Sequence, residues 1–285
     1  MAQLDMEAPP AAGLQRVGQR PALLPYLAET WRRRSFALTL AGYRLTADLL
    51  LNRLGVLWIV LKPLSVALVY GTIFHFLLSG AARPANFLQY LIVGVFVFEF
   101  FTGSFSQGAK AITGNAKLVQ SLGFPRILLP VSVVAEQAMR MVPVVVLLGI
   151  LLLVFGEPLA WSWLLLVPIL AVMAVFNLGV ALVVARMSVR TRDVQQFIPI
   201  ITRILFYTSG IFFSVDGALA DYPILLTAVQ LIPTYDFIAI SRDVMLTGYT
   251  APAIAWVAAL AWATFGILFG VVFFWRDEAR YGLSD

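Results

Sequence analysis

The stretch Lys110–Pro130, KAITGNAKLVQSLGFPRILLP, is a polar and basic segment inside a chain that is otherwise nearly all apolar. Two hydrophobic runs precede it and about four follow it. It is too polar to cross a membrane, too short to be a domain and too rich in helix formers to be a flexible linker. The pattern predicts a short helix over 116–122, with Asn115 as its N-cap and Gly123 at its end. A short helix held between two spans is a place where a soluble partner can push.

The composition is that of a membrane protein with several spans. Hydrophobic residues make up 61% and charged residues 12% of the 285, and the mean hydropathy is +0.89. Soluble domains are about 45–50% apolar and about 25% charged, so a soluble protein with buried helices is disfavoured. The chain has no Cys and a single His, His75, which excludes disulfides, thiolate chemistry and a His cluster.

The N-terminal part is predicted to change character near residue 35. Residues 1–34 contain several Pro residues and no signal-peptide core, so we expect a disordered basic tail. Residues 35–53 are expected to form an amphipathic helix in the cytoplasmic interface, after the basic run Arg32-Arg33-Arg34. For the arginines alone, a solvated basic run is the alternative interpretation. The apolar face of this helix recurs at steps of four and three: Phe36, Leu40, Tyr43, Ala47, Leu50 and Leu54.

Residues 54–285 are predicted to be an all-α polytopic membrane domain with six transmembrane helices. The expected spans are Val56–Leu78, Phe87–Phe105, Ile127–Phe155, Trp163–Ala185, Phe197–Phe213 and Pro252–Trp275. Between the last two, the apolar run Tyr222–Ile232 is only about eleven residues long, whereas a crossing helix needs about 20. We therefore expect a re-entrant or interfacial segment there, inside an outer loop over 216–250.

The distribution of charge predicts the orientation. Lys and Arg gather before the first span, between spans two and three, between four and five, and at the C-terminus, whereas the alternate loops are acidic. By the positive-inside rule both termini and the segment 110–126 are expected to be cytoplasmic, which an even number of spans satisfies.

Sequence signals for an enzyme are weak. The chain has neither a P-loop nor an H-E-x-x-H motif. The acidic residues of the outer loop lack the paired spacing of a metal site: Asp216, Asp221, Asp236 and Asp243. A membrane enzyme acting on polyprenyl lipids stays as an alternative that would use this loop.

Ionisable residues inside the predicted spans are functional candidates, because a charge in the bilayer is costly. They are Lys62, Glu99, Glu136, Arg140 and Arg203. Glu136 and Arg140 are four residues apart, so they are expected to share a helix face and to pair. Structural pairing and the lining of a polar pathway both remain open, but the carboxylates are too few for a proton relay.

Aromatic residues gather in the second and fifth predicted spans. They are interpreted either as core packing and interface belts or as the lining of a pathway, since sugar rings stack on aromatic faces. The candidate lining residues are Phe96, Phe98, Phe100, Phe101, Phe105, Phe206 and Tyr207.

Four motifs, taken in order, carry a family resemblance. They are Trp58-x-x-Leu61-x-Pro63-Leu64, Asn115-x-Lys117-Leu118 with Phe124-Pro125-Arg126 and Pro130, Arg192-Asp193-Val194, and Pro233 with Arg242 and Gly248. Over roughly residues 45–281 the chain resembles the membrane subunit of type-2 ABC exporters of lipid-linked polysaccharides, such as O-antigen, capsule, teichoic acid or galactan. Two departures are Gln120-Ser121, where the family often has two lysines, and Ile232, where an Asn is usual.

The resemblance implies partners and roles. It implies a homodimer that encloses the pathway in a bacterial cytoplasmic membrane, two copies of a separate cytoplasmic ATPase that bind the ATP and Mg²⁺, and no cofactor, enzymatic activity or nucleic acid partner for this chain. The substrate would be a polyprenyl-pyrophosphate-linked glycan, with a small molecule or drug as the alternative cargo. The coupling residues would be Asn115, Lys117, Leu118, Phe124, Pro125 and Arg126. Residues 35–53 would form a gate helix, and the arginines beside it are our candidates for binding the pyrophosphate: Arg32, Arg33, Arg34, Arg44 and Arg53.

Overall fold

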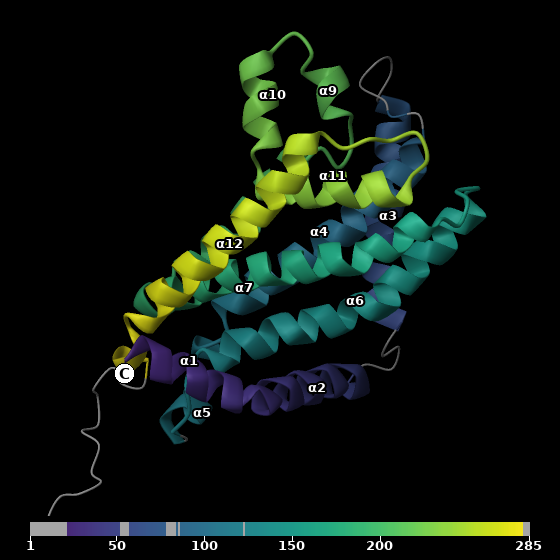
Figure 1. The fold of residues 1–285 in the computed structure, drawn as a ribbon. Coiled ribbons are helices and arrows are strands. Elements are labelled where there is room, and N and C mark those ends of the chain that lie inside the picture. The colour runs from purple at the N-terminus through teal and green to yellow at the C-terminus, as the bar shows by residue number, and fades with distance from the viewer. Residues whose placement is uncertain (1–21, 52–56, 78–83, 85, 122, 282–285) are drawn as a thin grey trace, which may run out of the picture.

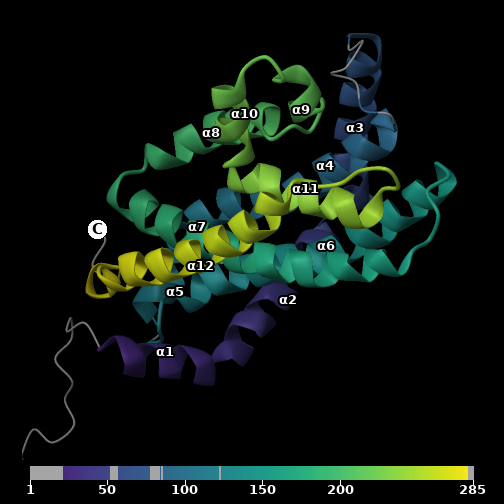
Figure 2. The same cartoon turned by 45° about the horizontal axis from the view of Figure 1, so that its top comes forward.

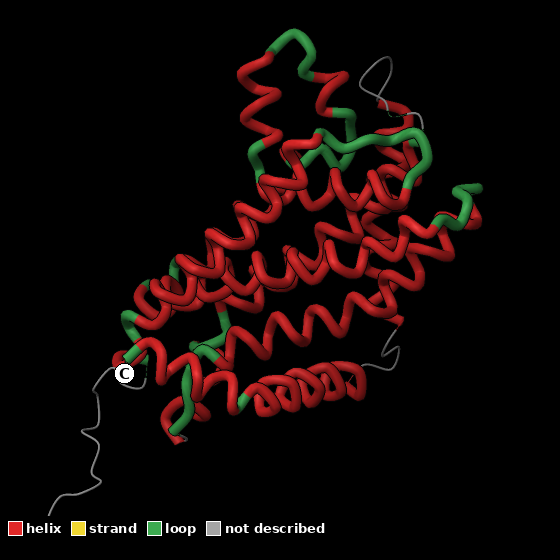
Figure 3. Tube along the Cα trace, in the orientation of Figure 1, coloured by secondary structure: helices red, strands yellow, loops and turns green. Residues whose placement is uncertain are grey.

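A computed structural model of the chain describes residues 22–51, 57–77, 84, 86–121 and 123–281 (Figure 1). The described residues form helices, turns and loops, with no β-strand among them (Figure 3). The α-helices are α1 Leu23–Arg32, α2 Arg34–Leu51, α3 Leu57–Leu77, α4 Phe87–Ala109, α5 Ala116–Ser121, α6 Leu128–Val154, α7 Leu166–Arg190, α8 Val194–Thr208, α9 Val215–Ala218, α10 Pro223–Gln230, α11 Pro233–Met245 and α12 Ala253–Trp275. The described residues also include the 3₁₀ turns η2 Thr113–Asn115 and η3 Trp161–Leu165 between helices and η4 Glu278–Arg280 after α12.

Five helical runs of the described chain are long and apolar enough to cross a membrane, which confirms the polytopic all-α prediction. They are Leu57–Phe74 in α3, α4, α6, the run Trp161–Arg190 that joins η3 to α7, and α12. The pair α10 and α11 passes the same test only as a bent unit, with an angle of 82°. The count is therefore five spans, or six if this bent pair is one span.

The fifth span predicted over 197–213 is wrong as a complete crossing. Its helix, α8, has 15 residues, or about 22 Å at 1.5 Å per residue, against a hydrocarbon core of about 30 Å. The helix ends because Gly210 has φ +62, the left-handed region that favours glycine, and a Cβ there would lie 2.6 Å from Val215.

The outer re-entrant segment predicted over 216–250 stays a prediction, but it contains α11, a core element that the apolar runs did not indicate. Every residue from Thr234 to Arg242 is buried, and α11 packs against α4, α7 and α12. Its acidic and basic residues lower the mean hydropathy of this stretch, and they concealed a core element from the analysis of apolar runs. The predicted re-entrant run Tyr222–Ile232 contains α10, and the sharp bend to α11 is the geometry of a broken span or a re-entrant loop.

Glycine allows α7 and α12 to approach closely. A Cβ built on Gly179 would lie 2.3 Å from the carbonyl carbon of Gly266, and one on Gly270 would lie 2.5 Å from the oxygen of Gly179. Gly266 and Gly270 are four apart on α12, the spacing by which small residues let membrane helices pack. Sequence analysis based on spans and charges did not use this signal.

The N-terminal part differs from its prediction in two ways. Residues 23–32, expected to be disordered, form α1, which is anchored by the buried Tyr26. The helix expected over 35–53 is present as α2, but Ala37 and Ala41, both fully buried, are its most buried residues, and α2 packs against α6. Tyr43 and Leu50, on the predicted apolar face, are 70% and 81% exposed. Small side chains on α2, and not its large apolar ones, let this helix approach α6 closely.

The bundle has two distinct ends. In both views α1, α5 and the chain end that follows α12 lie at one end, and α9 and α10 lie at the other (Figures 1 and 2). The end that carries α5 holds residues 110–126, which are predicted to couple the chain to an ATPase and are called the coupling segment below.

Substitution of Gly179 by Ala is expected to lower stability, because the added methyl group meets backbone atoms that cannot rotate away. We expect a loss of about 1–3 kcal/mol, measured as a lower melting temperature of the purified chain in detergent. The matched control is Gly42→Ala on α2, whose Cβ meets nothing within 4 Å. Equal melting temperatures for the two variants would contradict the packing argument.

Candidate functional site

The coupling segment begins where α4 ends and continues through η2 and α5. The predicted short helix is confirmed as α5, but the N-cap prediction is wrong. Asn115 donates from Nδ2 to the carbonyl of Ala111 at 2.8 Å, and its Oδ1 accepts from Nη2 of Arg44 at 3.1 Å. The side chain of Asn115 therefore ties the segment to α2 instead of capping α5.

One face of α5 is buried and the other is exposed. Val119 is 3% exposed and Leu118 is half-buried, and both pack in an apolar cluster with Tyr26, Ile127 and Tyr281. The exposed residues are Ala116, Lys117, Gln120 and Ser121. The segment thus presents a polar face, with one positive charge, at the end of the bundle.

Residues 124–126 fasten the segment after α5. The ring of Phe124 packs on that of Phe36 from α2, with centroids 5.1 Å apart, and Pro125 is buried. The backbone N–H of Arg126 donates to Oε1 of Glu278 at 2.9 Å, and its Nη1 donates to the Glu278 carbonyl at 3.2 Å. Phe124, Pro125 and Arg126 are therefore mainly anchors, whereas Lys117 is exposed.

Glu278 is the meeting point of three parts of the chain. Its Oε2 accepts from the hydroxyl of Tyr26 at 2.8 Å, and that hydroxyl accepts from the backbone N–H of Ile127 at 3.2 Å. Tyr26 and Glu278 are each 3% exposed. This Tyr26–Glu278–Arg126 network joins α1, the coupling segment and η4.

Burial sets the ionisation of this network. It raises the pKa of the Glu278 carboxyl, against the opposing hydrogen bonds from the Arg126 backbone and from Tyr26. Burial, reinforced by Glu278, also raises the pKa of the Tyr26 hydroxyl well above its ordinary value. Tyr26 therefore stays protonated and remains the donor at neutral pH.

A second network joins the C-terminal ends of α7 and α12. Oδ2 of Asp277 accepts from Nε of Arg186 at 2.8 Å and from Nε of Arg190 at 2.9 Å. Burial alone would raise the pKa of Asp277, but hydrogen bonds from Arg190 and Arg186 lower it overall. With Glu278 next in sequence, this turn carries two acidic anchors.

The family profile described as ABC-2 type transporter matches residues 42–246 of the chain, well over half of its length. The chain belongs to the ABC-2 type transporter family. This confirms the resemblance inferred from the four motifs, and it makes the chain a multi-pass membrane subunit of a transporter and not an enzyme.

Three relatives show how far the similarity extends. An O-antigen export system permease protein of Klebsiella pneumoniae is 25% identical over 198 residues, which are 69% of this chain and 74% of the relative. One of Myxococcus xanthus is 25% identical over 191 residues, 67% of this chain and 73% of the relative. A polysialic acid transport protein of Escherichia coli is 24% identical over 208 residues, 71% and 78% of the two chains.

The predicted phosphate-binding arginines do not converge on one point. Arg32 and Arg33 both pair with Glu29, Arg33 also donates to the carbonyl of Gly123 at 3.2 Å, and Arg34 donates to the carbonyl of Trp31. Arg44 is taken up by Asn115 and by Oγ of Ser132 at 3.1 Å. Arg53 lies outside the described residues. Pyrophosphate binding therefore stays a prediction, and Arg44 has another role in the structure.

The rings of α4 are buried within the described chain, where they pack in the core, and the lining of a pathway stays a prediction. Phe96, Phe98, Phe101 and Phe105 are at most 6% exposed. Phe100 is 2% exposed and is one of the residues that line a pocket. The reason is the central position of α4, because 72% of its apolar stretch is buried inside the bundle. Phe206 is half-buried and Tyr207 is 41% exposed, and both pack around Tyr70.

The acidic residues proposed for an enzyme are dispersed. Asp216 accepts from Gln230 at 3.1 Å, Asp243 accepts from Trp256 at 3.3 Å, and Asp236 is fully buried. Within the described residues no group of three or more metal-binding side chains occurs. The alternative of a polyprenyl-lipid enzyme in this loop has no geometric support.

Sequence analysis missed Tyr26, Asp277 and Glu278. Tyr26 lies in a stretch that was expected to be disordered, and the two acids follow the last span, where they look like ordinary solvated charges. The usable signal was a pair of acids in a C-terminal stretch that is otherwise basic.

Replacing Tyr26 by Phe is expected to loosen the coupling segment, because Oε2 of Glu278 and the N–H of Ile127 then lack this partner. An unsatisfied buried polar group costs about 1–3 kcal/mol. Hydrogen exchange of the amides in residues 116–127 should accelerate at least several-fold. Tyr43→Phe, at a hydroxyl-bearing ring on α2 that is 70% exposed, is the control and should exchange at the wild-type rate.

Replacing Phe101 by Ala distinguishes a role of this ring in core packing from a role in lining the transport pathway. Because Phe101 is a core ring, truncating it should lower the free energy of unfolding by about 3–5 kcal/mol. The loss should be measurable as a lower melting temperature and a lower yield of folded chain. Phe197→Ala on α8, where the ring is 58% exposed, should leave both nearly unchanged. A Phe101→Ala chain of unchanged stability with slowed transport would restore the lining interpretation.

Proposed function

We propose that this chain is the membrane subunit of an ABC exporter that moves a lipid-linked polysaccharide out of the cytoplasm. The observation that carries the proposal is the family membership together with the names of its relatives. Those relatives are named for O-antigen and polysialic acid, which are both polysaccharides, and each match covers about two thirds or more of both chains.

The energy would come from a separate ATPase subunit that binds ATP and Mg²⁺ and docks on α5. Support comes from the structure of the coupling segment. The helix α5 is short and exposes a polar face, and the Tyr26–Glu278–Arg126 network fixes the chain that follows it. Because the anchors belong to α1, α2 and η4, a push on α5 would be passed to several helices at once. Lys117 would make direct contact, and Asn115, Leu118, Phe124, Pro125 and Arg126 would hold the segment.

The functional unit would be a homodimer that encloses the pathway, with two ATPase copies on its cytoplasmic face. The positive-inside rule supports a cytoplasmic location for the end that carries α1, α5 and the C-terminal turn. The contact of Tyr26 with Glu278 places the two ends of the described chain together there. For the pyrophosphate of the lipid carrier, Arg32 and Arg34 are the best candidates, because both are exposed at that end.

Charge reversal on α5 is the direct test. Lys117→Glu should reduce co-purification of the ATPase and should abolish the stimulation of ATP hydrolysis, because the exposed face of α5 would repel an acidic partner surface. Export of the lipid-linked glycan in cells should fall about tenfold or more.

The matched control is Asp221→Lys, an exposed charge reversal of equal size in the loop before α10. It should leave assembly and export at wild-type levels. If Lys117→Glu assembles, hydrolyses ATP and exports normally, α5 is not the docking site. If cells depleted of the chain do not accumulate lipid-linked glycan, the cargo is not a polysaccharide.

A further inference from the structure

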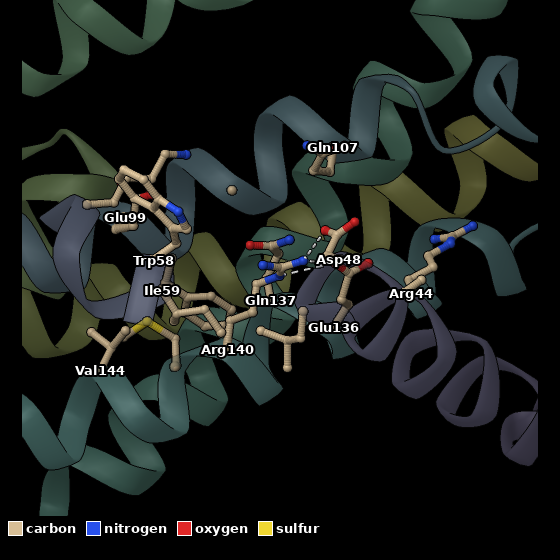
Figure 4. Close-up of a pocket in the computed structure, with 16 residues that line it drawn as sticks. Arg44, Asp48, Trp58, Ile59, Glu99, Gln107, Glu136, Gln137, Arg140 and Val144 are labelled. Carbon is tan, nitrogen blue, oxygen red and sulfur yellow. Dashed lines mark hydrogen bonds and ion pairs between the residues drawn. The ribbon is translucent and has the colours of Figure 1, made fainter. Parts of the chain in front are cut away.

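A pocket of approximately 680 Å³ lies between α2, α3, α4 and α6 (Figure 4). Its charged lining consists of Arg44, Asp48, Lys62, Glu99, Glu136 and Arg140. Figure 4 shows Trp58 and Glu99 at one end and Arg44 at the other, with Arg140 pointing toward Asp48 and Glu136 between them. Most of the in-span charges singled out from the sequence are thus brought to a single cavity.

The charges of the lining balance. Three cations, Arg44, Lys62 and Arg140, face three acids, Asp48, Glu99 and Glu136. Nη2 of Arg140 lies 2.7 Å from Glu136 and 2.5 Å from Asp48, so it is shared between two carboxylates. A pyrophosphate site needs an excess of positive charge, which this pocket does not offer. The lining instead suits a neutral ligand with many hydrogen-bonding groups.

The uncharged lining residues also suit a neutral ligand with many hydrogen-bonding groups. Trp58 lines the pocket and is 47% exposed overall, and its indole has a flat apolar face. Gln107 and Gln137 add amide groups from α4 and α6, each able to donate and accept. An aromatic face beside carboxylates, guanidinium groups and amides matches a sugar, whose ring has apolar faces and a rim of hydroxyls. The volume lies within the range of about 300–1,000 Å³ that is usual for small-molecule sites.

We propose that this pocket is a binding site for a neutral oligosaccharide segment of the transported glycan. The proposal rests on the proposed function and adds to it the place in the chain where the sugar is recognised. Trp58 stacks against a ring face, and the paired charges and amides bind hydroxyls.

Arg44 links this pocket to the coupling segment. Its side chain lines the pocket, and the same guanidinium donates to Asn115, next to α5, and to Ser132 on α6. A sugar that engages Arg44 competes for the donors that hold Asn115. Occupancy of the pocket therefore reaches the surface where the ATPase docks.

The chain contains no Cys, so single-cysteine labelling tests the site directly. Gln137→Cys and, independently, Gln107→Cys place a thiol on the wall from α6 or α4. In membranes that hold the chain with a hydrolysis-inactive ATPase, lipid-linked glycan should slow maleimide labelling at both positions at least fivefold. Thr46→Cys on α2, exposed and outside the pocket, is the control and should label at one rate in all membranes.

Three arms separate the possible ligands. Membranes that hold the same single-cysteine chains without the lipid-linked glycan should show no protection, whether they contain bare polyprenyl pyrophosphate or are treated with inorganic pyrophosphate. Protection by either would make the pocket a headgroup site and would overturn the proposal. Absence of protection by the glycan at both positions, in cells whose glycan export still requires this chain, would also overturn it while leaving the proposed function intact.

A substitution series gives a second measurement. Trp58→Ala should lower export of the glycan and its stimulation of ATP hydrolysis about 3- to 10-fold, and Trp58→Tyr should restore most of both, since a flat ring is what the sugar requires. Assembly with the ATPase should be the same in all three chains. Equal loss in the Ala and Tyr variants, or loss of assembly, would show that Trp58 has only a packing role.

Discussion

Arg242 is fully buried in α11 and donates to three backbone carbonyls, those of Tyr90 at 3.1 Å, Gly210 at 3.0 Å and Ile211 at 3.2 Å. Its guanidinium also lies 3.3 Å from the centroid of the Tyr90 ring. A membrane leaves no water for exposed backbone groups, so a helix that breaks inside the bundle must have its carbonyls satisfied by protein. Arg242 supplies those donors where α8 ends. The hydroxyl of Tyr90 adds a donor for the carbonyls of Gly210 and Phe213, each at 3.0 Å, so Arg242 and Tyr90 together hold the break between α8 and the buried α11.

The same constraint acts at the other end of the bundle with different groups. There the backbone N–H groups of Arg126 and Ile127, which begin the return into α6, donate to Glu278 and to Tyr26. Buried charged and hydroxyl side chains therefore pair with backbone hydrogen-bonding groups at both ends of the bundle. The consequence differs, because Arg242 fixes an interior break whereas Glu278 fixes the base of an exposed helix. An exposed α5 on a fixed base is what a proposed docking surface for an ATPase needs.

The sequence was sufficient for the features that depend on long apolar runs. α3, α4, α6, α7 and α12 were predictable because each has the length and hydropathy of a span, and α5 because polar residues interrupt two such runs. The predictions failed for elements that bury charged side chains. α11 carries Asp236, Arg242 and Asp243, and hydropathy alone assigns such residues to water. The roles of Tyr26 and Glu278 depend on a contact between residues 252 positions apart, which no local pattern encodes. The rings of α4 were ambiguous because packing and lining use the same residue types, and only the surroundings of the helix separate them.

The position of α2 explains why the pocket and the coupling segment are connected. Ala37 and Ala41 set this helix close against α6, and that closeness brings Arg44 to Asn115 and Ser132 and brings Asp48 to Arg140. A larger residue at either alanine would separate both pairs together, since all of these contacts share one helix face at spacings of three and four. The same argument limits what α2 can do as a gate. Any outward movement of α2 breaks the contacts of Arg44 with the coupling segment and of Asp48 with Arg140 in the same step. Under the proposed function, opening of the pocket and release of the coupling segment are one event, and a sugar that replaces these contacts stabilises the open arrangement.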